Sequence, residues 1–171
     1  MKRLLLIILN LLCLWIHPQT LSYSNANSYW AYRVLNIPTL KLTPPKKPII
    51  VAVVDDGFRL SHNDLKAYIF QNTKEIPLNQ KDDDNNGYID DTQGWDISDN
   101  DPDASLPPTR EHLFYHGTMV ASAIISVVKE AYGDDSQHML KVLPVKVLSS
   151  QAKNTYLADG YKGIRYAIDQ G

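Results

Sequence analysis

The sequence predicts an α/β fold with a mostly parallel sheet. Two apolar runs rich in Val, Ile and Leu, residues 49–54 and 141–148, have the length and composition of buried strands. Residues 116–128, and a later stretch that begins near residue 154, carry apolar side chains at helical spacing. Strand, long loop, helix, strand and helix follow one another, which is the order expected of an open α/β sheet.

The overall composition is that of an ordinary globular domain. The 171 residues include 17 Lys+Arg and 19 Asp+Glu, for a formal net charge of −2, and 44% are hydrophobic. These values exclude wholesale disorder, collagen and a polytopic membrane protein, and the charge offers no basic footprint for a nucleic-acid partner. The single cysteine excludes a disulfide framework and a Cys-based zinc site.

The N-terminus has the pattern of a signal peptide. Lys2 and Arg3 precede an apolar run over residues 4–16 that only Asn10 interrupts, and small residues near Ser22 follow it. Such a run is short for a membrane span and suits the core of a signal peptide. We therefore expect residues 1–22 to be removed on export, which leaves a secreted or periplasmic protein with no stable membrane association.

The elements of the domain follow an arm and linker over residues 23–47, which end in a proline-rich stretch. The first strand, 49–54, is bounded by Pro48 and by the turn-forming residues that follow it. Residues 82–103 contain nine aspartates and no Lys or Arg, so we expect a loop there. The second helix is predicted from an apolar face at steps of four, three and four residues: Leu157, Tyr161, Ile164 and Ile168.

Two residues at predicted element ends carry candidate catalytic chemistry. Asp55 directly follows the first strand, and functional groups of open α/β sheets gather at the carboxyl ends of strands. His116 is placed at the start of the first helix, where an imidazole can act as a general base near neutral pH. A carboxylate at the strand end could orient that imidazole.

The sequences around these two residues resemble the motifs of one peptidase family. Residues 51–57, Val-Ala-Val-Val-Asp-Asp-Gly, resemble the aspartate motif of the subtilisin-like serine peptidases, the subtilases. Residues 116–121, His-Gly-Thr-Met-Val-Ala, resemble their histidine motif, and residues 143–148 resemble the strand that follows it. The order and the structural contexts of the motifs agree with the family.

The resemblance implies a three-layer subtilisin-like α/β fold with a mostly parallel sheet, of which residues 48–171 are the N-terminal portion, truncated after the second main helix. It implies a secreted serine endopeptidase that acts on polypeptides, with Asp55 as the triad aspartate, His116 as the triad histidine and Asp56 as a turn residue. None of the serines lies in the Gly-Thr-Ser motif of the family. We therefore expect the missing C-terminal half of the domain to be a required partner, and the chain alone to be inactive.

The first half of the aspartate-rich loop predicts a calcium site. Asp82, Asp84, Asn86 and Asp90 place carboxylate or amide oxygens at alternating positions around a glycine, as in the first nine positions of a calcium loop. Gln93 stands where the bidentate glutamate of an EF-hand would be, so an EF-hand is not expected. A hard cation is favoured over zinc, because the loop contains no His or Cys.

A second acidic cluster follows at Asp96, Asp99 and Asp101, and it resembles a calcium-binding loop of some thermostable subtilases. We expect both clusters to lack a local positive side chain and to need calcium to relieve their mutual repulsion. Spacing alone does not decide which of the two clusters binds the ion.

Two other functions are compatible with parts of the sequence. One is a non-catalytic exported calcium-loop binding module, or a pseudoenzyme, since no serine motif is present. The other is a response-regulator receiver, whose first strand ends in an acidic pair similar to Asp55 and Asp56. The predicted signal peptide disfavours a receiver, because receivers work beside cytoplasmic kinases.

Overall fold

A computed structural model describes residues 34–37, 43–107, 116–152 and 159–170. The predicted signal peptide, most of the N-terminal arm, and the start of the second predicted helix with Leu157 lie outside the described residues. The described part contains the strand, helix and loop segments on which the site predictions depend.

The sheet is parallel, as the sequence predicts. Strand β1 (Ile49–Asp55) pairs with β3 (Leu140–Lys146), and β3 pairs on its other side with the two-residue strand β2 (Trp95–Asp96), giving the order β1-β3-β2. The register sets Asp55 beside Lys146, so the carboxyl ends of β1 and β3 lie at the same edge of the sheet. Strand β2 is the one regular element inside the segment that was predicted to be entirely loop.

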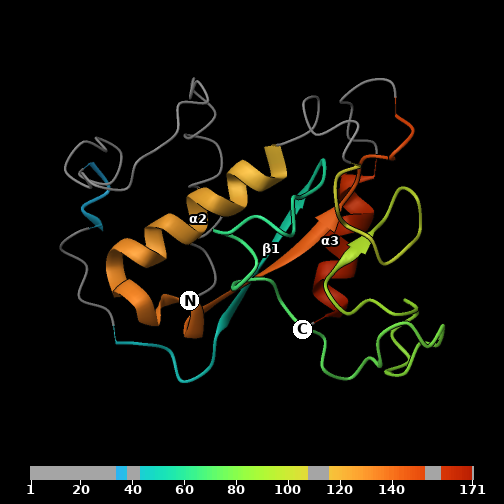
Figure 1. Ribbon diagram of the computed structural model, residues 1–171, viewed down its shortest axis with the longest axis horizontal. Coiled ribbons are helices and arrows are strands. Elements are labelled where there is room, and N and C mark those ends of the chain that lie inside the picture. The colour runs from blue at the N-terminus through green and yellow to red at the C-terminus, as the bar shows by residue number, and fades with distance from the viewer. Residues whose placement is uncertain (1–33, 38–42, 108–115, 153–158, 171) are drawn as a thin grey trace.

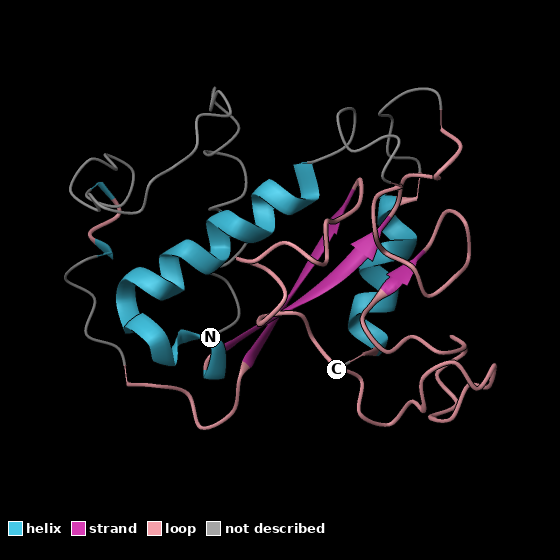
Figure 2. Cartoon of the chain, in the orientation of Figure 1, coloured by secondary structure: helices cyan, strands magenta, loops and turns pink. Residues whose placement is uncertain are grey.

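Helices α2 (His116–Tyr132) and α3 (Gly160–Asp169) cover opposite faces of this sheet (Figure 1 and Figure 2). Residues of β1 and β3 alternate between the two sides: Val142 packs in one core cluster with Ala121 and Ile125 of α2, whereas Val145 packs in another with Tyr166 of α3. Period-two alternation is the normal consequence of a pleated strand. The three-layer α/β arrangement is therefore confirmed.

The helix boundaries differ from those expected. Helix α2 begins at His116, as predicted, but continues to Tyr132 and into the 3-10 turn η4 (Gly133–His138). Its fully buried residues are Gly117, Ala121 and Ile125, whereas Val120 and Ile124 of the predicted face are only partly buried at the edge of the core. The helix is thus rotated by about one residue from the orientation that its apolar pattern favours.

The burial of β1 was overestimated. The sequence suits a strand covered on both faces, but Ile49 is 56% exposed and Ile50 is 44% exposed. The reason is position: β1 lies at one end of the β1-β3-β2 order, and its first two residues are exposed. Only the second half of the strand, which leads to Asp55, is well packed.

Helix α3 approaches the sheet through a glycine. A methyl group on Gly163 would lie 2.6 Å from Cγ1 of Val54 and 2.8 Å from Cγ1 of Val147, distances that no side chain tolerates. The face that the sequence marked as apolar, Tyr161, Ile164 and Ile168, points away from this contact and is exposed. Helix α3 therefore packs through its small residue and Tyr166 rather than through its apolar stripe.

Candidate active site

The structure brings Asp55 and His116 together at the carboxyl edge of the sheet. Asp55 is the last residue of β1, and His116 is the first residue of α2. Nδ1 of His116 lies 3.0 Å from Oδ1 and 2.9 Å from Oδ2 of Asp55. The two residues are 61 positions apart in the chain, so this contact is made by the fold and not by local sequence.

The contact defines which nitrogen of the ring carries a proton. An ionised carboxylate only accepts hydrogen bonds, so Nδ1 of His116 must be the donor. In the neutral ring Nε2 is then the nitrogen that can accept a proton. The carboxylate side chain is only 10% exposed, whereas the histidine side chain is 54% exposed, which leaves the imidazole open to a reacting group.

Gly117 allows the helix to start this close to the strand. A methyl group on Gly117 would lie 2.5 Å from the carbonyl oxygen of Gly57 and 3.1 Å from Cβ of Asp55. Any larger residue would push the first turn of α2 away from the end of β1. The glycine after the histidine therefore has a direct geometric reason.

Asp56 was predicted to be a turn residue, and this prediction is incomplete. Its Oδ1 accepts a hydrogen bond of 2.9 Å from the amide of Gly117, and its Oδ2 accepts one of 3.2 Å from the amide of His116. Burial raises the pKa of the Asp56 carboxyl, against the opposing effect of these amide donors. The sequence held one signal for this role, since the residue before His116 is Tyr115, which is not one of the usual capping types.

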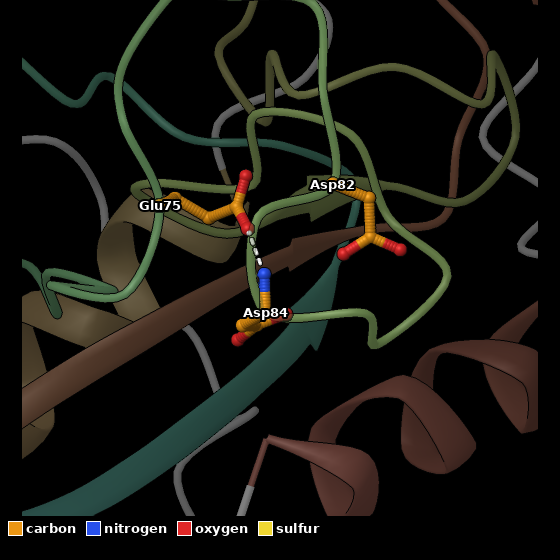
Figure 3. Close-up of side chains that lie close together, drawn as sticks. All are labelled: Glu75, Asp82 and Asp84. Atoms are coloured by element: carbon orange, nitrogen blue, oxygen red, sulfur yellow. Dashed lines mark hydrogen bonds between the residues drawn. The ribbon is translucent and has the colours of Figure 1, made fainter.

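The first acidic loop gathers three carboxylates, one of which the sequence analysis missed. Oxygen atoms of Glu75, Asp82 and Asp84 lie within 4.8 Å of one another (Figure 3). The Glu75 side chain also accepts hydrogen bonds from the amides of Asp83 and Asp84. Glu75 lies outside the calcium-loop spacing, so only the fold could reveal it.

The other two predicted ligands of this loop do different work. Both carboxylate oxygens of Asp90 accept hydrogen bonds from backbone amides, one from Asn79 and one from Gln80. The side chain of Asn86 donates to Asp91, while its amide donates to Asp82 and Asp84. These contacts shape the loop around the cluster of Glu75, Asp82 and Asp84.

Both acidic clusters contain a local cation, contrary to our expectation. At the first, Nζ of the exposed Lys74 lies 3.9 Å from Oδ2 of Asp84, and at the second the cation is the buried Lys146. Nζ of Lys146 contacts Oδ2 of Asp96, lies 3.5 Å from Oδ2 of Asp99 and donates to the hydroxyl of Ser150 at 2.8 Å. Asp101 is held differently, because its backbone pairs with that of Asp96. Lys146 was overlooked because it lies on β3, about fifty residues further along the chain.

The pKa values of the two carboxylates beside Lys146 are shifted in opposite directions. Burial raises the pKa of Asp96 to about 6, although the hydrogen bond and charge of Lys146 favour the ionised form. For Asp99 burial acts in the same upward direction, but hydrogen bonds from Ser149 and Ser150 and the charge of Lys146 outweigh it and lower the pKa to about 2.

Asp91 joins the first acidic loop to helix α3. Its fully buried carboxylate accepts hydrogen bonds from Asn72, Asn86, Tyr166 and Gln170, the last two at 2.9 and 2.6 Å. Burial raises the pKa of this carboxyl, against the hydrogen bonds that favour its charge. Nothing in the sequence distinguishes Asp91 from its neighbour Asp90.

Comparison with known proteins agrees with this geometry. The model of the subtilase family matches residues 46–171. The chain belongs to the subtilase family. This family consists of serine peptidases, and the match includes both the strand that ends in Asp55 and the helix that starts with His116.

Individual subtilases can also be compared with the chain. It is 31% identical over 121 residues to subtilisin-like protease 1 of Plasmodium vivax, and 32% identical over 123 residues to that of Plasmodium berghei. Subtilisin-like protease 1 of Plasmodium falciparum is 31% identical over 121 residues. Each match covers 70% of this chain but only 17–19% of the relative, so the chain spans less than a fifth of these proteases.

Proposed function

We propose that this subtilase chain supplies the aspartate and the histidine of a serine endopeptidase that cleaves polypeptides. The observation that carries the proposal is the double contact between Nδ1 of His116 and the carboxylate of Asp55, at 3.0 and 2.9 Å. It supports a fixed ring orientation in which Nδ1 donates to Asp55 and Nε2 is the nitrogen left to exchange a proton.

In the proposed reaction, Nε2 of His116 removes the proton from an attacking serine hydroxyl and later gives it to the leaving amine. Asp55 holds the ring in the required tautomer and stabilises the imidazolium that forms. None of the serines in the sequence lies in a Gly-Thr-Ser motif, so the proposal places the attacking serine outside these 171 residues. The chain alone would then lack the attacking serine and would not cleave peptide bonds.

The proposal is tested by peptide hydrolysis with two protein forms. The longer protein that contains this chain together with a serine motif should cleave casein, and residues 23–171 alone should not. In the longer protein His116→Ala should reduce kcat by about 10⁴-fold or more, as losses of triad residues do in the related subtilisin. His62→Ala is the matched control, because the contacts of the His62 ring are with Asp64: it accepts a hydrogen bond from the Asp64 amide and lies 3.8 Å from the Asp64 carboxylate. Full activity of His116→Ala would refute the proposed role.

Export is a second part of the proposal. It is supported by the basic start and the apolar run of residues 1–22. No helix among the residues that the structure describes is long and apolar enough to cross a bilayer. Expression with the native N-terminus, followed by N-terminal sequencing of the product outside the cell, should show a mature chain that begins after Ser22 or within the next few residues. Retention of the intact N-terminus would overturn it.

We also propose that the first acidic loop binds calcium as a structural ion. The support is chemical: three carboxylates, Glu75, Asp82 and Asp84, offer oxygen atoms within 4.8 Å of one another, and calcium prefers such hard ligands. The alternative function, a non-catalytic calcium-loop module, predicts the same ion affinity. It differs in its predicted activity: even a longer form of the protein would show no hydrolysis for His116→Ala to abolish.

A further inference from the structure

Two consecutive carboxylates at the end of β1 hold the same histidine at two different points. Asp55 contacts the imidazole, while Asp56 accepts hydrogen bonds from the backbone amides of His116 and Gly117. The first of these bonds fixes the ring and the others fix the start of helix α2.

The local geometry makes this pair of contacts rigid. The backbone amide of Asp56 donates at 2.8 Å to Oδ1 of Asp55, so the Asp55 carboxylate is also held by the backbone of the next residue. Both residues are 7% exposed, which limits the competition from water for these bonds. Gly57, with φ of +136°, turns the chain immediately afterwards and brings its carbonyl oxygen against Gly117.

The amides that Asp56 binds have no alternative partner within the helix. The first N–H groups of an α-helix lack intrahelical acceptors and need a side chain or water. The usual acceptor is the side chain of the residue just before the helix. In this chain the acceptor comes instead from the strand end, 60 residues earlier. A carboxylate is also favoured there by the positive end of the helix dipole.

We infer that Asp56 is a positioning residue, which caps helix α2 from the sheet and thereby holds the imidazole of His116 in line with Asp55. This inference rests on the proposed function, since it concerns the residue that would act as base. Asp56 touches no reacting atom in this role. Its loss should let the helix start move, and displacements of about 1 Å at a catalytic group can cost about 100-fold in rate.

The direct test is proton NMR of the whole 171-residue chain, and it needs no catalytic activity. The wild-type chain should show a slowly exchanging Nδ1 proton of His116 and a protected amide at Gly117. Asp56→Ala should broaden or remove the Nδ1 resonance and raise the exchange rate of the Gly117 amide about 10-fold or more. Asp56→Ser, which keeps one acceptor, should restore the Nδ1 resonance, and the exposed Asp135→Ala is the matched control.

The outcomes separate this inference from the proposed function. If Asp55→Asn removes the Nδ1 resonance while Asp56→Ala leaves it and the Gly117 amide unchanged, the positioning role is wrong and the Asp55–His116 pair stands. If the wild-type chain shows no such resonance, both are wrong. Should Asp56→Ala fail to fold, Asp56→Asn decides: it can accept only one of the two amides, so unchanged protection at both His116 and Gly117 would overturn the inference.

A kinetic readout extends the test to the longer, active protein. There Asp56→Ala should lower kcat about 10- to 100-fold with less than a two-fold change in KM, because the residue aligns the base without contacting substrate. Asp56→Ser should recover most of kcat. A rise in KM with unchanged kcat would instead place Asp56 in substrate binding and would contradict the inference.

Discussion

Asp96 and Lys146 are paired twice, once through the backbone and once through their side chains. They are register partners in the parallel pair of β2 and β3, and the Lys146 ammonium contacts the Asp96 carboxylate directly. Both side chains are at least 98% buried. The short strand β2 is therefore held to the sheet by an ion pair at its last residue, beside the edge that carries Asp55.

Removing the lysine from this pair should destabilise the fold strongly. Lys146→Met leaves Asp96 buried without its partner, and breaking a buried pair in this way costs about 3–5 kcal/mol. Urea denaturation of the purified chain should show this loss in the free energy of unfolding. Lys162→Met is the control, because Lys162 pairs with Asp159 at the surface and such pairs contribute about 1 kcal/mol at most. Equal effects of the two substitutions would contradict the buried pair.

The two aspartates beside Lys146 should make the free energy of unfolding depend on pH in opposite directions. The folded pKa of Asp96, about 6, exceeds the ordinary 3.8, so the folded state binds the proton more tightly and this contribution to stability falls as pH rises from about 4 to 6. The folded pKa of Asp99, about 2, is below 3.8, so its contribution is present above about pH 4 and is lost as pH falls to 2. Melting temperatures should be measured across pH 2–7. The melting temperature of Asp96→Asn should depend less on pH than that of the wild type between about pH 4 and 6, and that of Asp99→Asn should depend less on pH between about pH 2 and 4.

Calcium should act through the first acidic loop and not through the second. The buried Lys146 already compensates Asp96 and Asp99, whereas Glu75, Asp82 and Asp84 concentrate three carboxylates beside the exposed Lys74, which lies 3.9 Å from Asp84. Calcium at 100 times its Kd should stabilise the protein by about 2.7 kcal/mol. Asp84→Ala should abolish the rise in melting temperature, and Asp99→Ala should leave it. Magnesium should give a much smaller rise, since it demands tighter octahedral geometry. A melt unchanged by EGTA, with no calcium found by elemental analysis, would show that the loop binds no ion.

Gly117→Ala should disturb the candidate site more than the rest of the fold. The added methyl group would meet the carbonyl oxygen of Gly57 at 2.5 Å, so the start of α2 must move away from β1. We expect a loss of stability of about 1–3 kcal/mol, the usual cost of overpacking, together with loss of the slowly exchanging Nδ1 proton of His116. Gly133→Ala is the comparison, because no atom lies within 4 Å of the methyl group there, although its φ of +62° adds strain. It should leave the imidazole signal intact.

The exposed apolar face of α3 should make the chain self-associate or bind a hydrophobic dye. Tyr161 is 83% exposed, Ile164 is 52% exposed and Ile168 is 67% exposed, and contiguous apolar surface of this kind promotes association. Ile164→Gln combined with Ile168→Gln should reduce light scattering and dye binding without changing the signal of His116. Clear, monomeric wild-type solutions at high concentration would contradict this expectation.

The parallel sheet and the Asp55–His116 contact were accessible from the sequence because each depends on strong local patterns. A β-branched run before Asp55 and a helical period after His116 place both residues at element ends, and family motifs put them in the same site. The burial of β1 and the orientation of α3 were harder to predict, because an apolar run does not reveal whether a strand lies at a sheet edge. Ile49 and Ile164 look like core residues in the sequence and are exposed in the fold.

Two of the missed site residues, Asp56 and Lys146, have a partner far away in the chain. Asp56 caps a helix 60 residues later, and Lys146 neutralises an aspartate 50 residues earlier. Glu75 precedes the calcium-loop spacing by several residues and joins it only through the turn of the loop. Spacing rules describe neighbours along the chain, so contacts of this length emerge only when strands and loops have been placed.

The buried carboxylate of Asp91 means that the acidic loop cannot loosen by itself. Two of its four donors, Tyr166 and Gln170, belong to helix α3 and the residue that follows it, and Tyr166 is also the main aromatic side chain beneath that helix. Opening the loop would remove the acceptor from both, so the loop and the last turn of the helix should form one cooperative unit in hydrogen exchange. An ion bound among Glu75, Asp82 and Asp84 would then slow hydrogen exchange in the last turn of α3, a helix that the ion itself does not contact.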